Sequence, residues 1–388
     1  MTQITRREFA TRLARAGGLA LVHGAVPSWV LGAVAAQTAR APRPDLIERN
    51  EWPEHWETTV EALGRSLLTP NSAFFVRSHF AVPDVDPADY RLEVTGLVHK
   101  PLSLSLAEFR ARTRTEAVCT LECAGNGRGL FALHNTSGTQ WQYGAVGTAS
   151  WGGVLLASLL ESAGVKPGAK HVWFEAADHS TLPSVPPFLR SIPLERAMSE
   201  TLLADTMNGE PLPKLHGAPV RVVVPGWYGM ASTKWVTRIR VEAAPSDNHF
   251  MIRGYRYVKP GGSPLESPPV EELLVKSLIT RPLEGERVPI GRPLAVSGLA
   301  WAGSAGLKSV DISTDQGASW QTATLTGPAH RDAWRQWSAS VPVSRPGSIT
   351  LLARATDGKG VAQPLVATPN GSGYGNNSQH RVVVHAQG

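Results

Sequence analysis

The sequence predicts an α+β protein of two domains, the second of them a β-sandwich of immunoglobulin type. Its 388 residues exceed what one hydrophobic core usually organises, and an apolar fraction of 42% is ordinary for a folded chain. The composition changes near residue 265, where "SPLESPPVEELL" forms a proline-rich connection. Beyond it, short alternating segments such as "SVDISTDQGASWQTATL" are separated by glycine turns, which is typical of antiparallel strands. We therefore expect a first domain at 71–264 and a sandwich at 265–388.

Residues 1–36 have the pattern of a twin-arginine export signal. Arg6 and Arg7 are followed by a weakly apolar stretch and by "AVAAQTA", which predicts cleavage near Ala35. The alternative is a basic amphipathic helix of the mature fold. We expect a periplasmic mature protein without a membrane span, because no later stretch approaches the roughly 20 apolar residues that cross a bilayer.

Residues 37–70 contain "EWPEHWETTVEALGRSLL", which predicts a linker and a short helix that lead into the first domain. The formal charge of the chain is +6, and arginines of the export signal contribute to it. The chain has no lysine-rich run of the kind that grips nucleic acid. The basic balance therefore indicates an anionic substrate rather than nucleic acid.

Cys119 and Cys123 are the only cysteines and would by default form a disulfide in an oxidising compartment. However, "EAVCTLEC" is rich in strand formers and runs into a glycine-rich stretch, which predicts a strand that ends in a tight loop. Four residues along a strand separate the Cα atoms by roughly 13 Å, too far for a disulfide; in a helix they would be about 6 Å apart. A thiolate beside Arg128 suits a transition metal, although one thiolate cannot complete a zinc site.

Six segments resemble, in this order, blocks of the sulfite oxidase family of molybdenum enzymes. The resemblance runs from about Phe74 to the C-terminus. It implies a molybdopterin-binding core followed by a dimerisation sandwich, with one molybdenum per chain and no haem in this chain. The segments are "FFVRSHF", "LECAGNGR", "GTQWQYGAVGTASWGGVLL", "RSIPLERAM", "MNGEPLPKLHGAPVRVVVPGWYGMASTKWV" and "LAWAGSAGLKSVDISTDQGASW".

The resemblance makes Cys123 the thiolate ligand of molybdenum, and we expect Gly125 and Gly127 to let the loop approach the cofactor closely. Cys119 has no matching role and is interpreted as a small buried hydrophobe. The residues implied for binding molybdopterin are Phe75, Val76, Arg77, Ser78, His79, Asp178, His216, Arg221, Ser232, Thr233 and Lys234. Instead of binding the cofactor, Asp178 could simply occupy a turn, and Lys234 could lie at the solvated end of a strand.

The resemblance also implies a substrate pocket for sulfite or another small sulfur oxyanion. Fixed, planar guanidinium groups suit such an anion better than mobile lysines. The implied pocket residues are Arg77, Arg128, Trp141, Tyr255 and Arg335, the last from "AWRQW" in the second domain. Taken singly, each of these arginines could instead lie on the surface. Each of the aromatic residues could instead pack in the core. Tyr257 follows two residues after Tyr255, so either tyrosine could fill that place.

The activity implied is molybdenum-dependent oxidation of sulfite to sulfate by oxygen-atom transfer, with electrons passed to a separate c-type cytochrome and with the chain as a homodimer. Three alternatives remain open: oxidation of another sulfur species, as in sulfane dehydrogenases; reduction of an S-oxide such as methionine sulfoxide; and a cofactor-free binding protein built on the sandwich. Gly127 stands where the family has the first of two paired arginines. The segment "DHSTLPSVPPFLRSIPL" also differs from its animal counterpart, which leaves the specificity open.

Overall fold

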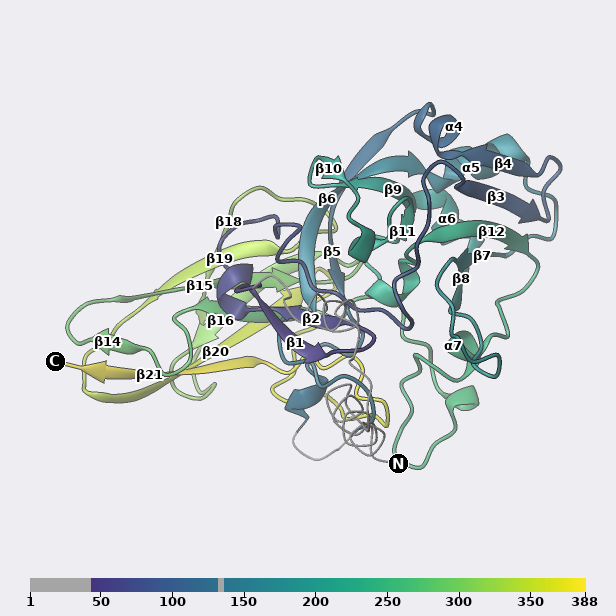
Figure 1. Ribbon diagram of the computed structural model, residues 1–388. Coiled ribbons are helices and arrows are strands. Elements are labelled where there is room, and N and C mark those ends of the chain that lie inside the picture. Colours follow the sequence, from purple (N-terminus) through teal and green to yellow (C-terminus); the bar gives the residue numbers. More distant parts are fainter. Residues whose placement is uncertain (1–42, 132–135) are drawn as a thin grey trace, which may run out of the picture. The chain divides into compact units, whose positions relative to one another are not determined.

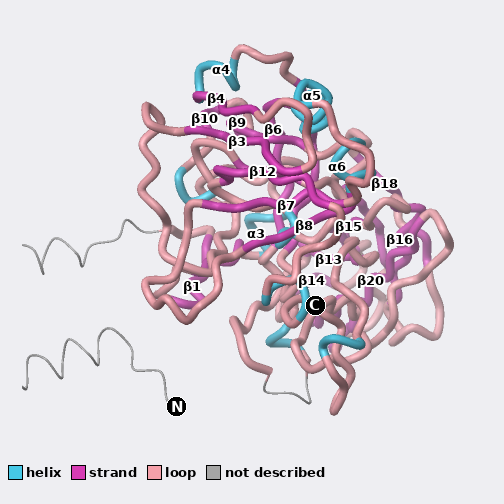
Figure 2. Tube along the Cα trace, turned by 90° about the vertical axis from the view of Figure 1, so that its right-hand side faces the viewer, coloured by secondary structure: helices cyan, strands magenta, loops and turns pink. Residues whose placement is uncertain are grey.

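The computed structural model describes residues 43–131 and 136–388, and the predicted export signal lies outside them. Strands dominate, and the helices are few and short (Figure 2). Pro44–Gly388 forms one compact unit. The boundary predicted near residue 265 therefore separates two hydrophobic cores inside one unit rather than two bodies that pack independently.

The first domain contains two five-stranded sheets. One has the order β10-β9-β6-β5, with β11 also pairing with β9, and all its pairings are antiparallel. Its strands are β5 (Thr115–Glu122), β6 (Val146–Leu155), β9 (Leu202–Met207), β10 (Glu210–Pro211) and β11 (Arg221–Val223). The other has the order β4-β3-β12-β7-β8, in which only β3 and β12 run parallel. Its strands are β3 (Arg91–Gly96), β4 (Leu102–Ser105), β7 (His171–Ala176), β8 (Leu189–Pro193) and β12 (Val236–Glu242).

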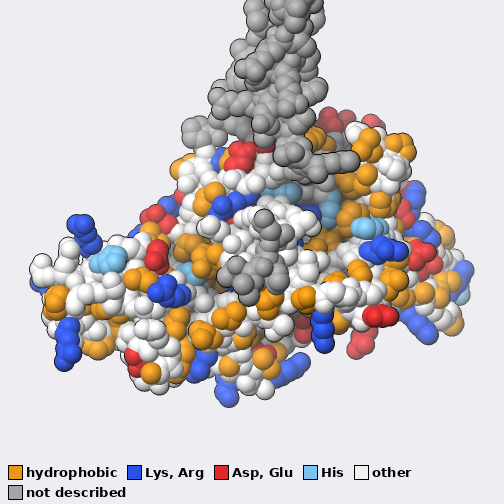
Figure 3. All heavy atoms as spheres, turned by 90° about the horizontal axis from the view of Figure 1, so that it is seen from below, with side chains coloured by type: hydrophobic (Ala, Val, Ile, Leu, Met, Phe, Trp, Pro, Cys, Tyr) orange, Lys and Arg blue, Asp and Glu red, His pale blue; other side chains and the backbone are white. Residues whose placement is uncertain are grey.

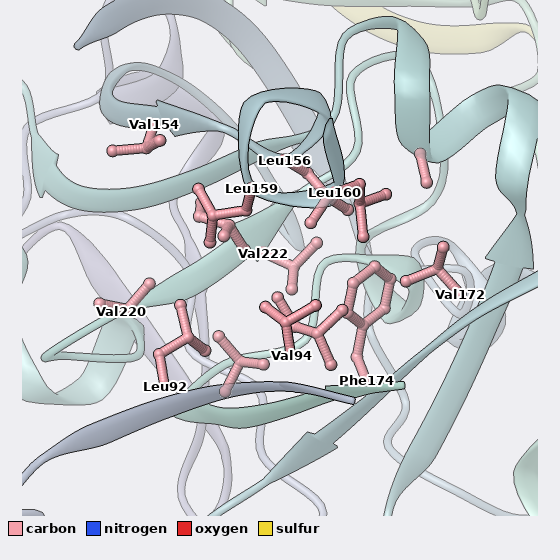
Figure 4. Close-up of a cluster of buried hydrophobic side chains, with 14 of the residues drawn as sticks. Leu92, Val94, Val154, Leu156, Leu159, Leu160, Val172, Phe174, Val220 and Val222 are labelled. Atoms are coloured by element: carbon pink, nitrogen blue, oxygen red, sulfur yellow. The ribbon is translucent and has the colours of Figure 1, made fainter. Parts of the chain in front are cut away.

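The main core of this domain lies between helix α5 (Leu156–Ala163) and the strands beneath it. Leu156, Leu159 and Leu160 of α5 are fully buried, at the three- and four-residue spacing of one helix face. Figure 4 shows them above Val94 of β3 and Phe174 of β7. The remaining helices of the described chain are α3 (Val60–Leu63), α4 (Leu106–Arg110), α6 (Leu194–Ser199) and α7 (His249–Ile252).

The segment predicted as a linker and helix contains more structure than expected. Strands β1 (Leu46–Asn50) and β2 (His55–Thr58) form an antiparallel hairpin, and among the described residues of this segment, 43–70, only the four of α3 are α-helical. Trp56 of β2 exchanges both backbone hydrogen bonds with Val76, at 2.9 Å each. The hairpin thus belongs to the first domain, because it pairs with the segment that was predicted to bind the cofactor.

The second domain is a sandwich of two sheets, as predicted from its alternating segments. The four-stranded sheet has the order β13-β15-β19-β18 and the five-stranded sheet β14-β21-β20-β16-β17. Apolar side chains from both sheets form one core, including Val296 and Trp337 of the first sheet and Val310 and Leu351 of the second. The strands are β13 (Lys276–Arg281), β14 (Arg287–Pro289), β15 (Leu294–Trp301), β16 (Leu307–Ser313), β17 (Gln321–Thr322), β18 (Thr324–Thr326), β19 (Arg335–Val341), β20 (Gly347–Asp357) and β21 (His380–Gln387).

A buried ion pair joins the two domains. In Figure 1 the strands of the first domain run from purple to teal and those of the second from green to yellow. Glu122, the last residue of β5, accepts a hydrogen bond of 2.9 Å from Lys276 Nζ of β13 and another of 2.9 Å from Trp301 Nε1 of β15. Only 1% of the Glu122 side chain and 7% of the Lys276 side chain are exposed. The strand that leads to Cys123 is therefore anchored on the second domain.

Within residues 43–131 and 136–388, no helix has the length and apolar character needed to cross a bilayer. On the face seen in Figure 3, lysine and arginine side chains lie among acidic and apolar ones rather than in one stripe.

Lys276→Met should lower the free energy of unfolding by about 3–5 kcal/mol, because Glu122 would stay buried without its cation. The matched control is Arg281→Met, which breaks the exposed pair between Arg281 and Glu61 and should change the free energy of unfolding by less than about 1 kcal/mol. Chemical denaturation of both variants and the wild type measures this. Equal losses in the two variants would show that the buried pair does not anchor the domains.

Candidate active site

Cys123 lies directly after the last residue of β5, as predicted. Its backbone N–H donates to Ala145 O (2.8 Å), and its carbonyl accepts from Asn126 N (2.8 Å), which closes the tight loop. The Cys123 thiol is partly exposed, whereas Cys119 is buried in the core of the first domain, and both are free thiols. The strand geometry therefore prevents a disulfide, as the sequence indicated.

Cys123 lines a cavity that is partly open to solvent. Its empty space, together with the solvent at its mouth, is about 730 Å³. Segments distant in sequence line it: the stretch before His79, the end of β5, the loop after β7 and the region from His216 to Trp235. The cavity thus collects most of the cofactor-binding residues implied by the resemblance.

The stretch "FFVRSH" contributes Phe75, Arg77, Ser78 and His79 to the cavity wall. Val76 does not reach the cavity. Its side chain is buried against Leu46 and Trp56, and its backbone groups pair with Trp56. Extended backbone directs this side chain away from its neighbours, and the assignment of Val76 as a cofactor contact stays a prediction.

Two cationic residues of the wall, Arg221 and Lys234, come from the region around β11. Arg221 is buried and donates to His216 O (2.8 Å) and Ser232 O (3.1 Å), and burial lowers its pKa to about 10. Lys234 Nζ donates to Ser78 Oγ (2.8 Å) and Leu215 O (3.0 Å). Burial lowers the pKa of Lys234 well below its usual range, and Arg221 adds to this effect. These buried charges favour an anionic ligand.

The remaining predicted cofactor contacts also line the cavity: Asp178, His216, Ser232 and Thr233. Burial raises the pKa of Asp178, while the nearby Lys234 ammonium opposes the shift. The Thr233 hydroxyl is buried and has no hydrogen-bond partner among the described residues. Because buried polar groups are almost always paired in proteins, this hydroxyl points to a ligand of the cavity.

Tyr255 lines the cavity next to His79, and Tyr257 does not line it. The Tyr255 hydroxyl lies 2.9 Å from His79 Nε2, and burial raises the pKa of this phenol. Burial and Arg77 hold the pKa of His79 well below its usual range, so its ring is neutral. Tyr255 has φ 55°, a left-handed conformation that a tyrosine keeps only where surrounding contacts enforce it.

Arg128 is not among the residues that line the cavity, and its role in binding the anion stays a prediction. It is buried and donates to Ser372 O (2.9 Å) and Thr139 O (3.0 Å). The neighbouring glycines serve the protein rather than the cofactor. A Cβ on Gly125 would meet the Arg128 guanidinium at 2.7 Å, and one on Gly127 would meet Asn376 Cβ at 2.9 Å.

Two predicted pocket residues are elsewhere. Trp141 is fully buried, with its ring centroid 5.6 Å from that of His55, and does not line the cavity. Arg335 begins β19, pairs with Ala300 of β15 and does not line the cavity either. The pocket roles predicted for Trp141 and Arg335 therefore stay predictions: Trp141 packs beside His55, and Arg335 lies on a strand of the second domain.

The sequence analysis missed two aromatic residues near the site. Phe188 lines the cavity and stacks on His79, with ring centroids 4.2 Å apart. Tyr374, from the second domain, stacks on Tyr255 with centroids 5.2 Å apart. Phe188 lies in the proline-rich segment that departs from the animal pattern, and Tyr374 lies in the glycine- and asparagine-rich stretch "NGSGYGNN". Such stretches signal a loop, but not where the loop docks.

These residues fit a molybdopterin cofactor. The cavity offers one thiol for a metal, cations for an anionic tail and the unpaired Thr233 hydroxyl for a polar group of the ligand. In the described part of the chain, no group of three His, Cys, Asp or Glu side chains could hold a metal by itself. The other metal ligands must then come from the cofactor.

Thiol labelling of cofactor-free protein should modify Cys123 and spare Cys119. Cys123 is partly exposed, whereas Cys119 is fully buried and burial raises the pKa of its thiol. Mass spectrometry after iodoacetamide treatment counts and locates the labels. One label on the native protein and two after denaturation are expected, and early labelling of Cys119 would contradict the burial of that residue.

Several known proteins are similar to this chain in sequence, and a solved structure is similar in fold. Residues 79–250 match the family model described as oxidoreductase molybdopterin binding domain, and residues 267–387 match the Mo-co oxidoreductase dimerisation domain. The sulfite oxidase of Gallus gallus is 38% identical over 84% of this chain and 74% of its own length. Mitochondrial sulfite oxidase of Homo sapiens is 38% identical over 88% of this chain and 66% of its own length, so the chain spans about two thirds of that relative.

The crystal structure of the sulfane dehydrogenase SoxCD from Paracoccus pantotrophus superposes with a TM-score of 0.77 at 30% identity, and covers 94% of this chain and 93% of that one. These matches and the thiol-lined cavity rule out a cofactor-free binding protein. The chain is an enzyme that uses molybdenum bound to molybdopterin, and it belongs to the sulfite oxidase family.

Proposed function

We propose that this enzyme oxidises sulfite to sulfate. In the balanced reaction, sulfite and water give sulfate, two protons and two electrons. The observation that carries the proposal is the position of Cys123, a partly exposed thiol in a cavity whose wall includes Arg77. A guanidinium beside the metal site suits a small sulfur oxyanion.

When bound, the molybdenum cofactor supplies the oxygen-atom transfer and accepts the two electrons. Cys123 would hold the metal. Arg221 and Lys234 would neutralise the negative charge of the cofactor, since both lie buried in the cavity wall. Thr233 and Ser232 would give polar contacts to it.

Tyr255 and His79 would handle substrate hydrogen bonding. Because the Arg77 guanidinium can only donate to His79 Nδ1, the neutral ring carries its proton on Nε2 and donates to the Tyr255 oxygen. The raised pKa keeps the Tyr255 proton in place at neutral pH, so its O–H can donate to an oxygen of the bound anion. Arg77 contacts the His79 ring at Nδ1 and lies beside this pair. The protein's contribution is therefore the positioning and electrostatic stabilisation of the anion.

The surroundings of the reaction follow from the sequence. The twin-arginine pattern supports export to the periplasm, and the electron acceptor would be a c-type cytochrome, as the resemblance to the family implies. The second domain would be an immunoglobulin-type sandwich that forms a homodimer, which the dimerisation-domain match supports.

Sulfite-dependent reduction of cytochrome c by protein purified from molybdenum-fed cells tests the proposal. A sample with one molybdenum per chain that reduces no cytochrome c, and no artificial acceptor such as ferricyanide, would reject sulfite as substrate. Oxidation of a sulfane sulfur is the second candidate, because a sulfane dehydrogenase shares the fold. Reduction of an S-oxide is the third, and a panel of sulfur compounds distinguishes all three.

Cys123→Ser should nearly abolish sulfite oxidation, because a hydroxyl is a poor substitute for a thiolate on molybdenum. The soluble fold should persist, since the thiol is not part of a core. Cys119→Ser is the control and should keep the molybdenum content, because Cys119 does not line the cavity. Steady-state turnover and metal analysis measure both, and wild-type turnover in Cys123→Ser would end the ligand assignment.

Arg128→Gln should raise the KM for sulfite by more than about tenfold, in line with a lost charge contribution of roughly 1.5–3 kcal/mol. Arg65→Gln, which breaks an exposed pair with Asp45, is the control and should leave KM unchanged. Initial rates over a range of sulfite concentrations measure KM. An unchanged KM in Arg128→Gln would give Arg128 a purely structural role.

A further inference from the structure

A loop of the second domain forms hydrogen bonds with the Cys123 loop of the first domain. The loop comprises residues 370–377. Gly375 N donates to Ala124 O (2.9 Å), and Asn376 Nδ2 donates to Gly127 O (2.8 Å). In the opposite direction, Arg128 Nε donates to Ser372 O (2.9 Å). Three hydrogen bonds therefore fix this loop against the residues that follow the metal-binding thiol.

Tyr374 is the side chain that this loop presents to the site. Its ring lies under the guanidinium of Arg128, with Arg128 Cζ 5.2 Å from the ring centroid. The same ring stacks on Tyr255 at 5.2 Å and 20°. One aromatic residue thus contacts both the buried arginine and a tyrosine of the cavity wall.

The loop is built to hold this ring in place. Asn370 accepts from Tyr374 N (3.0 Å) and donates to Tyr374 O (2.7 Å). Gly373 has φ 62°, and a Cβ there would come within 2.8 Å of Arg128 Cγ. Only glycine permits this close approach, so the backbone is shaped around the arginine.

Arg128 and Tyr255, the two residues that the Tyr374 ring contacts, each depend on neighbouring contacts to hold their conformation. Arg128 is a long side chain with many rotamers, and an arginine over an aromatic face gains attraction that grows when water is excluded. Tyr255 has a left-handed backbone, which persists where neighbouring contacts over-determine it. Besides Tyr374, those contacts include His79 at its hydroxyl and Arg190, whose Cζ lies 5.3 Å from the centroid of its ring.

We propose that Tyr374 is a positioning residue of the anion site, contributed by the second domain, and that it holds the Arg128 guanidinium and the Tyr255 ring for substrate binding. The inference rests on the proposed function for its substrate. It gives the second domain a part in the site through the loop at residues 370–377.

Tyr374→Leu should raise the KM for sulfite by about five- to thirtyfold, the range that a desolvated cation–π contact carries. The change in kcat should be smaller than that in KM, because no reacting group is removed. Tyr374→Phe keeps the ring and should restore KM to within about threefold of wild type. Tyr143→Leu is the matched control: Tyr143 belongs to the same apolar cluster but packs on His380, and its loss should leave KM unchanged.

A double-mutant cycle distinguishes positioning from general destabilisation. In an Arg128→Gln background, Tyr374→Leu should raise KM by less than about twofold, since the group that it positions is already gone. Tyr374→Met, of similar volume to leucine, replaces Tyr374→Leu if that variant is insoluble. Additive effects, or a KM in Tyr374→Phe as high as in Tyr374→Leu, would overturn the proposal.

Binding of sulfate to the molybdenum-loaded protein, followed by calorimetry, gives a readout independent of turnover. The dissociation constant of sulfate should rise in Tyr374→Leu by the same factor as KM and stay near wild type in Tyr374→Phe. Wild-type protein that binds sulfate but oxidises no sulfite would reject the proposed function, and the sulfate series would still decide the role of Tyr374. A wild type that binds no sulfate, or equal binding in all variants, would overturn it.

Discussion

The carboxylate of Glu122 is the contact on which the rest of the structure depends. It precedes Cys123 and lies in the interior, where an ionised carboxylate persists only with full hydrogen bonding. Its partners are Lys276 and Trp301 from the second domain and Asn126 from the loop after the thiol, each at 2.9 Å. One side chain therefore sets where β5 ends, how the loop turns and how the two domains meet.

The cavity itself is electrostatically incomplete without a ligand. Arg221 and Lys234 are buried and donate to carbonyl and hydroxyl oxygens, which carry no formal charge to balance these cations. The lowered pKa of each reflects this. An anionic cofactor would supply the missing negative charge, which makes folding and cofactor binding favour one another in this protein.

The second domain has two roles in this molecule. Its sandwich core is independent of the site, yet its Lys276 and the loop at residues 370–377 determine the geometry of the Cys123 loop. This arrangement explains why Pro44–Gly388 forms one compact unit although it contains two separate main cores. A change in the sandwich that shifts this loop reaches the active site through Arg128 and Tyr255.

The sequence by itself determined the local features. Strand formers followed by glycines placed Cys123 at a strand end, alternation predicted the sandwich, and the block resemblance identified the family and the residues around β11. These features depend on neighbours along the chain and on blocks with a family pattern. Val76 shows that the residues of one sequence block need not share a role, since alternation along the extended backbone points its side chain into the core.

Only the tertiary structure decided which distant segments meet. Arg335 lies on a strand of the second domain that pairs with β15, and Trp141 packs in the core beside His55. Neither position follows from the residues next to them in the sequence. The glycines of the Cys123 loop make room for Arg128 and Asn376, and Tyr374 reaches the site from a loop about 250 residues away from Cys123 in the chain. Such contacts are set by how sheets and loops pack in space, and no periodicity in the sequence records them.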